Sequence, residues 1–369
     1  MGIDDPEVIM LGVAEMKFRI APALRAALKQ TAKTGFFGYA LRAPEEMTGA
    51  VCSWFARRHN WTVAPEQIIQ TTSVVASLGA AIRTLSRPGD GVLILSPCYG
   101  PFRRITELND RRMVDCPLRL TDGRWELDLE DIEAKAADPA NKILLLCNPH
   151  NPTGRVWTRE ELTALGEICL RHGLYVVSDE IHCDLVFAPR VNIPFASISP
   201  ELAEITVTST SPSKGFNIAG LTIGNVIISN PDLRERVAAT MEANMFKYIN
   251  VFGFAACTAA YRDCEPWLDE LHEVLRGNAD YFRGWMAENF PAVTVYPLEG
   301  TYLQWADFSC FGSDPEARKK FLVNEARFFS DSGVNFGPQY GAYERINLAC
   351  PRRYLTAALD RLAQAAARR

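Results

Sequence analysis

Lys214 lies between two stretches of sequence that are unusual neighbours for a surface lysine. It follows the small and hydroxylic stretch TSTSPS, residues 208–213, and precedes the apolar run FNIAGL, residues 216–221. A lysine in an exposed turn would have no chemical role. A lysine sheltered from water has a lowered pKa, and its neutral amine can form an imine with an aldehyde. From this stretch alone both interpretations stay open.

Other residues with chemical potential also follow apolar segments. Free backbone amides at a helix start beside a serine suit a phosphate group. A carboxylate at the end of an apolar strand is costly unless it is paired. Each residue also has an ordinary explanation, namely a helix cap, a turn, an ion pair or a core histidine. The residues are Ser73, Val74 and Val75 after IIQTT, Tyr99 after VLILSP, Asn151 in NPHNPTG, and Asp179 and His182 in VSDEIHCD.

The pattern of apolar residues predicts the elements that position these side chains. Short apolar runs indicate strands at 67–72, 92–97, 111–118, 142–149, 174–180, 204–211 and 221–229. Amphipathic stretches indicate helices at 74–86, 99–109, 128–137 and 158–173. This alternation is typical of βαβ units and predicts an α/β fold with a mostly parallel sheet. Ligands of such sheets lie at the carboxyl ends of the strands, where the polar residues should gather.

The pattern changes after Pro231. Long helices are expected through about Asn289, followed by an antiparallel pair within 293–308, a helix at 315–333, a strand at 345–351 and a last helix to Arg369. These elements predict a smaller α+β domain. We therefore expect an N-terminal segment, residues 1–35, that joins the small domain, a large domain at 36–265 and the small domain at 266–369.

Composition excludes several classes of partner. The chain has 369 residues, 48% of them hydrophobic, and a net charge of −5. No block of basic residues and no apolar run of about 18 residues occurs, so neither nucleic acid nor a membrane is an expected partner. The ten cysteines are scattered, without CxxC or zinc-site spacing. This predicts no metal site and free thiols in the cytoplasm.

Longer motifs resemble a known family. NPHNPTG, VSDEIHCDL and SPSKGFNIAGL resemble the fold-type-I pyridoxal-phosphate enzymes, the aspartate aminotransferase superfamily. VAEMKF, GFFGY, EGTYLQWADF and RINLACPRRYL are similar to segments of its cystathionine and cysteine-S-conjugate β-lyase branch. The resemblance runs from about Leu11 to the C-terminus. It implies a three-layer large domain with a mostly parallel sheet, a smaller α+β domain, pyridoxal phosphate as cofactor and a homodimer.

The resemblance also implies roles for individual residues around the cofactor. Lys214 would hold the cofactor through an imine, and Asp179 would pair with its ring nitrogen. Asn151 would hydrogen-bond the phenolic oxygen with His182 beside it, and Tyr99 would stack on the ring. Lys214, Tyr99 and Asp179 would be the catalytic residues. The phosphate end would be bound by Ser73, Val74, Val75, Ser211 and Ser213.

Three further residues complete the site that the resemblance implies. Tyr39 would reach the phosphate of the neighbouring subunit's cofactor. Arg345 would clamp the α-carboxylate of an amino-acid substrate in a two-pronged contact, with Asn151 and Glu15 on the same side.

The sequence departs from the branch at four positions, most of which border the substrate side. Glu15 and Lys17 stand where aspartates are usual, Thr34 replaces a histidine and Gly215 replaces a threonine. The resemblance predicts a C–S β-lyase that cleaves an S-substituted cysteine to thiol, pyruvate and ammonia. An aminotransferase or a specialised biosynthetic elimination enzyme shares the same core motifs. A regulatory or scaffold protein is disfavoured because the catalytic positions are complete.

Overall fold

A seven-stranded sheet forms the centre of the molecule in the computed structural model, which describes residues 7–40, 43–246 and 248–369. Strand β10 is antiparallel to both of its neighbours, and the other adjacent strands are parallel. The predicted fold class is confirmed by this mostly parallel sheet. Its strands, in spatial order, are β2 (Ile68–Thr71), β10 (Gly224–Ile227), β9 (Thr206–Thr210), β8 (Tyr175–Asp179), β7 (Asn141–Cys147), β3 (Gly91–Ser96) and β4 (Arg112–Pro117).

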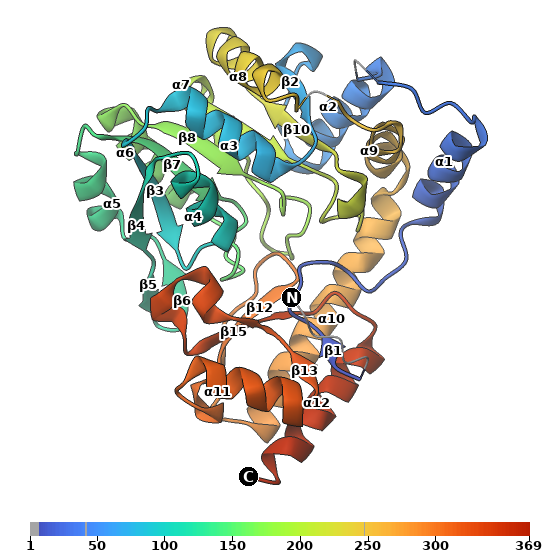
Figure 1. Cartoon of the computed structure of the whole chain (residues 1–369), viewed down its shortest axis with the longest axis vertical. Helices are drawn as coiled ribbons and strands as arrows, with labels where there is room; N and C mark the ends of the chain where they lie inside the picture. The colour runs from blue at the N-terminus through green and yellow to red at the C-terminus, as the bar shows by residue number, and fades with distance from the viewer. Residues whose placement is uncertain (1–6, 41–42, 247) are drawn as a thin grey trace.

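Helices cover both faces of this sheet, which explains why its strands are apolar without alternation. Alternate residues of β3 and β7 enter separate cores, with Leu93 and Leu144 in one and Ile94 and Leu145 in the other. Figure 1 shows these layers in its upper part. Helices α3 (Val74–Leu85), α4 (Gly100–Glu107) and α8 (Pro231–Ala243) pack on one face, and α5 (Leu129–Ala136), α6 (Arg159–His172) and α7 (Pro200–Glu204) on the other.

Helix ends follow the capping residues in the sequence. The Asp128 carboxylate accepts a hydrogen bond from the amide of Asp131 at 3.1 Å and begins α5, as predicted. The Thr158 hydroxyl and Glu161 form a capping box at the start of α6, and Gly173, at φ 67°, ends that helix. Two short strands, β5 (Arg119–Thr121) and β6 (Arg124–Glu126), form a hairpin before α5.

The C-terminal part contains a second sheet with the order β11–β12–β15–β14. It lies with α11 and α12 in the lower part of Figure 1, and the long helix α10 runs down to it. The strands are β11 (Thr294–Val295), β12 (Leu303–Asp307), β14 (Asp331–Ser332) and β15 (Tyr343–Asn347). The helices are α9 (Val251–Asp263), α10 (Glu265–Asn289), α11 (Pro315–Lys320) and α12 (Arg352–Ala366).

The helix predicted at 315–333 is wrong in its second half. Helix α11 ends at Lys320, a π-helical turn covers Phe321–Glu325, and Arg327 has φ 51°. The chain then becomes extended because β13 (Phe328–Phe329) pairs in parallel with β1 (Ile9–Met10). Apolar residues that suggested a helix face therefore belong to a strand that is stabilised by the N-terminal segment.

The N-terminal segment joins elements from both parts of the chain. Strand β1 pairs with β13, whereas α1 (Pro22–Lys33) packs against α9, as does α2 (Glu45–His59) of the part that follows. Residues 1–6 of the predicted segment 1–35 lie outside the described residues, as do 41–42 and 247 of the predicted large domain. The domain boundaries at 35 and 265 remain predictions. Within the described ranges, every helix is too short or too polar to cross a bilayer.

Candidate active site

Polar side chains gather at the carboxyl ends of β7, β8 and β9. The residues that line one cavity there include seven of the predicted site residues: Val74, Val75, Tyr99, Asn151, Asp179, His182 and Lys214. Ala14, Cys147 and Ile181 complete its wall. Parallel strands bring their carboxyl ends to one edge, so residues that are far apart in the sequence converge.

Asp179 is the last residue of β8 and is buried. Its Oδ1 accepts a hydrogen bond from the amide of Ile181 at 3.1 Å. Burial raises the pKa of this carboxyl to about 7, although the Ile181 amide and the Lys214 ammonium both favour the charged form. The carboxylate is thus ready to pair with a cationic group inside the cavity.

Lys214 extends into the same cavity from the turn after β9. Its Nζ donates a hydrogen bond to the carbonyl of Ala14 at 2.6 Å, and the hydroxyl of Tyr302 donates to the same carbonyl at 3.1 Å. Burial and the positive charge of Arg345 lower the pKa of Lys214, while Asp179 raises it. The amine therefore loses its proton more readily than that of an exposed lysine.

His182 and Tyr99 provide two of the cavity's rings. Burial and the charges of Lys214 and Arg345 lower the pKa of His182 to about 3, so the imidazole is neutral at physiological pH. Its Nδ1 is buried and has no hydrogen-bond partner among the described residues. Burial raises the pKa of Tyr99, as does the nearby Asp179 charge, so its phenol stays protonated.

Arg345, on β15, reaches the site from the small C-terminal sheet. Its Nη1 donates to Oδ1 of Asn151 at 3.0 Å. Both side chains are buried, with exposed fractions of 3% and 4%. The two residues lie 194 positions apart in the sequence, and the contact connects the loop after β7 to the second sheet.

The amino end of α3 supplies the predicted phosphate contacts. Ser73 caps this helix by accepting from the amide of Ala76 at 3.1 Å, and the first amides of a helix have no partner within it. Ser211 donates its hydroxyl proton to the Ile223 carbonyl at 2.6 Å and accepts from the amide of Ser213 at 3.0 Å. A phosphate contact donated by Ser211 therefore requires exchange of the bond to Ile223.

Six predicted site residues are not among those that line this cavity, namely Ser73, Ser211, Ser213, Arg345, Tyr39 and Glu15. Of these, Tyr39 and Glu15 are exposed at the surface. The side chain of Tyr39 is 88% exposed, and its ring lies 5.9 Å from that of Tyr248. This position is compatible with a role toward a neighbouring subunit, which remains a prediction. Glu15 is exposed; its backbone carbonyl accepts from Nδ2 of Asn347 at 2.6 Å, and its amide donates to the carbonyl of Val13 at 2.9 Å. Its charge is also among those that raise the pKa of Lys214. The substrate role of Glu15 also remains a prediction.

Sequence reasoning missed the contacts that hold the N-terminal strap, which we define as residues 12–18. Nδ2 of Asn347 donates to the carbonyls of Val13 and Glu15, and Asn217 bonds the backbone of Met16 on both sides. The strap also contacts the site directly, because the carbonyl of Ala14 accepts from Lys214 and that of Gly12 accepts from Arg345. Asn217 in GFNIAGL and Asn347 in RINLAC interrupt apolar runs, and this is the signal from which their structural roles could have been inferred.

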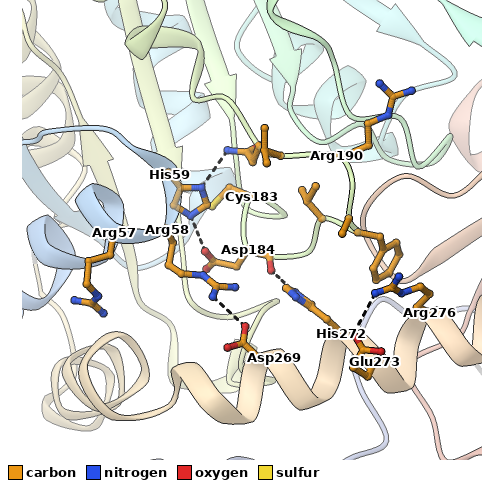
Figure 2. Close-up of a pocket in the computed structure, with 15 residues that line it drawn as sticks. Arg57, Arg58, His59, Cys183, Asp184, Arg190, Asp269, His272, Glu273 and Arg276 are labelled. Atoms are coloured by element: carbon orange, nitrogen blue, oxygen red, sulfur yellow. Dashed lines mark hydrogen bonds and ion pairs between the residues drawn. The ribbon is translucent and has the colours of Figure 1, made fainter.

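A second cavity, of about 500 Å³, is lined by residues of α2, of the loop after β8 and of α10 (Figure 2). His59, Cys183 and Asp184 form its buried edge, and their potential ligand atoms lie within 4.8 Å of one another. Oδ1 of Asp184, however, accepts from Nε1 of Trp54 at 2.8 Å and is 2.9 Å from Nε2 of His59. These hydrogen bonds account for the cluster without a metal, and the expected absence of a metal site stays a prediction.

Comparisons with known proteins agree on one family. The family model for aminotransferase class I and II matches residues 6–362. Cystathionine beta-lyase PatB of Bacillus subtilis is 39% identical over 93% of this chain and 89% of its own length. Cystalysin of Treponema denticola, whose crystal structure contains pyridoxal 5'-phosphate, superposes with a TM-score of 0.96 at 38% identity, over 99% of this chain and 92% of its own. The pyridoxal-phosphate-bound C–S lyase of Staphylococcus hominis superposes with a TM-score of 0.92 at 31% identity, over 98% of this chain and 89% of its own.

Proposed function

Because the chain belongs to the aminotransferase class I and II family, we propose that it is a pyridoxal-phosphate-dependent C–S β-lyase. It cleaves an S-substituted cysteine such as cystathionine to a thiol, pyruvate and ammonia. The observation that carries this proposal is that Lys214 and Asp179 line the same cavity, with a lowered and a raised pKa respectively. The reaction named for PatB and for the Staphylococcus enzyme favours elimination over amino-group transfer.

The residues of the cavity fit the cofactor. Asp179 has one backbone donor at Oδ1 and a raised pKa, so a protonated ring nitrogen would relieve the cost of its buried charge. Nδ1 of His182 lacks a partner on the same wall. Lys214 would hold the aldehyde carbon, and the start of α3, with Ser211 and Ser213, would hold the phosphate. When bound, pyridoxal phosphate supplies an aldehyde for amines and an electron sink for bonds at the substrate Cα.

The chain's own residues would direct this chemistry. Asp179 would keep a proton on the ring nitrogen. Arg345 would bind the α-carboxylate and fix the orientation of Cα. The amine of Lys214 would then remove the Cα proton, a task that requires an uncharged amine near neutral pH. The thiolate would leave from Cβ after that proton is removed.

A turnover assay tests the proposal. The enzyme, loaded with pyridoxal phosphate, is incubated with cystathionine and no 2-oxo acid. We expect many turnovers, with pyruvate and free thiol in equal amounts. An aminotransferase would stop after one turnover with the cofactor in its amine form, and that result would overturn the lyase assignment. An inactive protein that binds no pyridoxal phosphate would overturn the enzyme assignment.

We further propose that the working unit is a homodimer. Exposed aromatic side chains support this proposal, because Phe36, Phe37 and Tyr39 are 84%, 58% and 88% exposed, and such patches mark interfaces. Sedimentation should give twice the mass of the chain. Mixing Tyr39→Ala and Lys214→Ala subunits should restore activity, since a mixed dimer then holds one site with both residues intact. Absence of recovery in sedimentation-verified mixed dimers would overturn the role of Tyr39.

A cytoplasmic location is also proposed. All ten cysteines are free, and Cys310 is the exposed one among them. Free thiols are typical of a reducing compartment. Fractionation of the source cells tests this: recovery of the enzyme outside the cytoplasmic fraction would contradict it.

A further inference from the structure

The hydrogen bonds of Arg345 are unevenly distributed over its guanidinium. Nη1 donates to Asn151, whereas Nη2 donates both to the carbonyl of Gly12 at 2.9 Å and to Oδ2 of Asp331 at 2.8 Å. Nε is buried and has no hydrogen-bond partner among the described residues. A guanidinium has five N–H groups, so those left over belong to Nε and Nη1.

This distribution restricts how a carboxylate can bind. A two-pronged contact uses either the end of the guanidinium, through Nη1 and Nη2, or its side, through Nε and Nη2. Both modes include Nη2, whose two protons are already in use. A substrate carboxylate therefore binds Arg345 in this way only if Gly12 or Asp331 gives up its contact.

Gly12 is held more firmly than Asp331. The backbone beside Gly12 is fixed because Leu11 donates to the Phe329 carbonyl at 2.8 Å and accepts from the Asn347 amide at 2.6 Å. The contact of Asp331 is a side-chain contact, and that side chain is 14% exposed. Its other oxygen, Oδ1, accepts from Nδ2 of the exposed Asn335 at 2.7 Å. Rotation of the carboxyl group can thus free Nη2 while Asn335 keeps the carboxylate nearby.

We propose that Asp331 is a specificity-determining residue that holds Arg345 in the resting enzyme and competes with the α-carboxylate of the substrate for Nη2. The inference rests on the proposed function, because it requires Arg345 to bind that carboxylate. A buried guanidinium needs a counter-charge when no substrate is bound, and Asp331 supplies it. The displaced carboxylate stays beside the site and repels further negative charge, so dicarboxylic ligands bind less well than monocarboxylic ones.

Calorimetric titration of the cofactor-loaded enzyme with propionate and with succinate tests the proposal. Asp331→Asn keeps an acceptor for Nη2 but removes the charge. We expect propionate to bind about tenfold more tightly to this variant, and succinate to gain by a larger factor. The KM for S-methylcysteine should also fall about tenfold, while kcat changes less than about twofold. Substitution of a residue with a purely structural role would instead lower kcat. The control, Asp280→Asn, removes the same charge from a position that is 61% exposed and should change nothing.

The results distinguish the proposed role of Asp331 from that of Arg345. Unchanged or weaker propionate binding to Asp331→Asn overturns the role of Asp331. Should that variant fold poorly, Asp331→Ser removes the same charge and carries the same expectation. Propionate binding should be lost in Arg345→Ala. Retained binding there overturns the anchoring role of Arg345, and with it this part of the proposed function.

Discussion

Gly215 packs directly against the side chain of Asp184, one residue after the lysine of the active site. A Cβ built on Gly215 would stand 3.2 Å from Cβ of Asp184 and 3.5 Å from its Oδ2. Asp184 is held in place because Trp54 and His59 contact its Oδ1 and His272 lies 2.7 Å from its carbonyl oxygen. The turn that carries Lys214 therefore rests on a fixed, buried carboxylate, and the glycine permits this close approach.

Gly215→Ala should destabilise the protein by about 1 kcal/mol, because the added methyl group is tighter against Asp184 than packed atoms normally are. Urea denaturation of the cofactor-loaded enzyme measures the change. Gly220→Ala is the matched control, since nothing lies within 4 Å of a Cβ at Gly220. Equal stabilities of the two variants would contradict this prediction, because they would mean that the Lys214 turn shifts away from Asp184 without cost.

Lys214→Ala should abolish covalent attachment of the cofactor. After hydride reduction, mass spectrometry should find the added mass on the wild-type chain and on Lys33→Ala, which removes an exposed lysine from α1, but not on Lys214→Ala. We expect kcat/KM to fall by about 10³-fold or more, because proton removal from Cα loses its base. Full turnover in Lys214→Ala would contradict the assigned role.

The strand ends of the site were predictable from the sequence. Asp179 ends a strand, and Asn151 and Lys214 lie in the loops that follow two others; the parallel sheet brings those strand ends together. Local periodicity and capping residues suffice for such inferences, as the confirmed cap at Asp128 illustrates.

The contacts that close the site depend on tertiary pairing and were not predictable in the same way. Arg345 bonds Gly12 across 333 residues, and β13 forms where a helix was expected because β1 lies beside it. The contact between Arg345 and Asp331 spans only 14 residues, but Asp331 lay inside the wrongly predicted helix. Periodicity describes one element at a time and contains no information on such partners.

Asp179 should make the cofactor-free protein less stable as the pH rises. Its pKa is raised from 3.8 to about 7 by burial, so between these values the folded state holds a proton that the unfolded state has released. Stability therefore falls from about pH 4 to pH 7. Asp179→Asn, which has no such charge, should be more stable at pH 8 by up to about 4 kcal/mol. Urea denaturation from pH 5 to 8 measures this, and parallel pH curves for the two proteins would contradict it.

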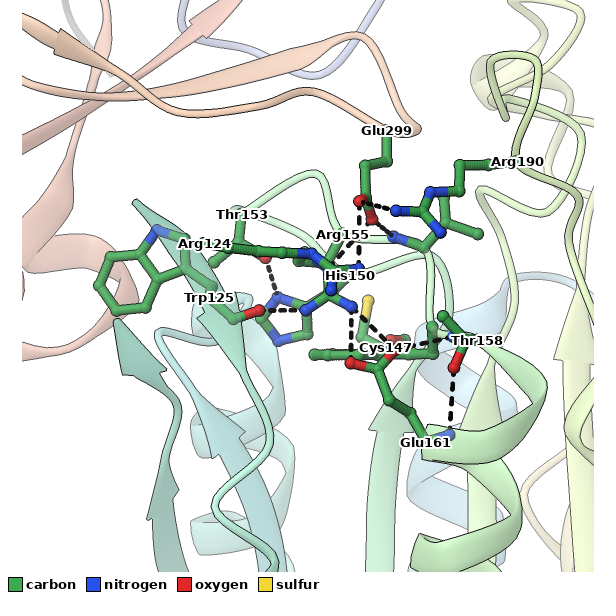
Figure 3. A network of polar contacts seen from close by, with 12 residues as sticks. Arg124, Trp125, Cys147, His150, Thr153, Arg155, Thr158, Glu161, Arg190 and Glu299 are labelled. Atoms are coloured by element: carbon green, nitrogen blue, oxygen red, sulfur yellow. Dashed lines mark hydrogen bonds and ion pairs between the residues drawn. The ribbon is translucent and has the colours of Figure 1, made fainter. Parts of the chain in front are cut away.

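Glu299 joins the loop of Asn151 to the C-terminal part through a polar network (Figure 3). One carboxylate oxygen accepts from Nε of Arg155 and the amide of Val156, both at 3.0 Å. The other accepts from Arg190 at 2.9 Å and from Arg124 at 3.3 Å. Burial opposes ionisation of Glu299, but the Val156 amide and Arg155 outweigh it and lower its pKa.

Glu299→Gln should therefore cost about 2 kcal/mol of stability at pH 7, because the buried Arg155 loses one of its counter-ions while Glu161 remains. A lowered folded pKa means that the stabilisation is present above the ordinary value of 4.5 and is lost as the pH falls through the folded pKa. The difference from wild type should thus shrink below about pH 4, as urea denaturation at pH 4 and 7 can measure. Glu273→Gln, at a side chain that is 73% exposed, should differ from wild type by less than about 0.5 kcal/mol. If Glu299→Gln lost as much stability at pH 4 as at pH 7, the shape of the Glu299 side chain, and not its charge, would stabilise the loop of Asn151.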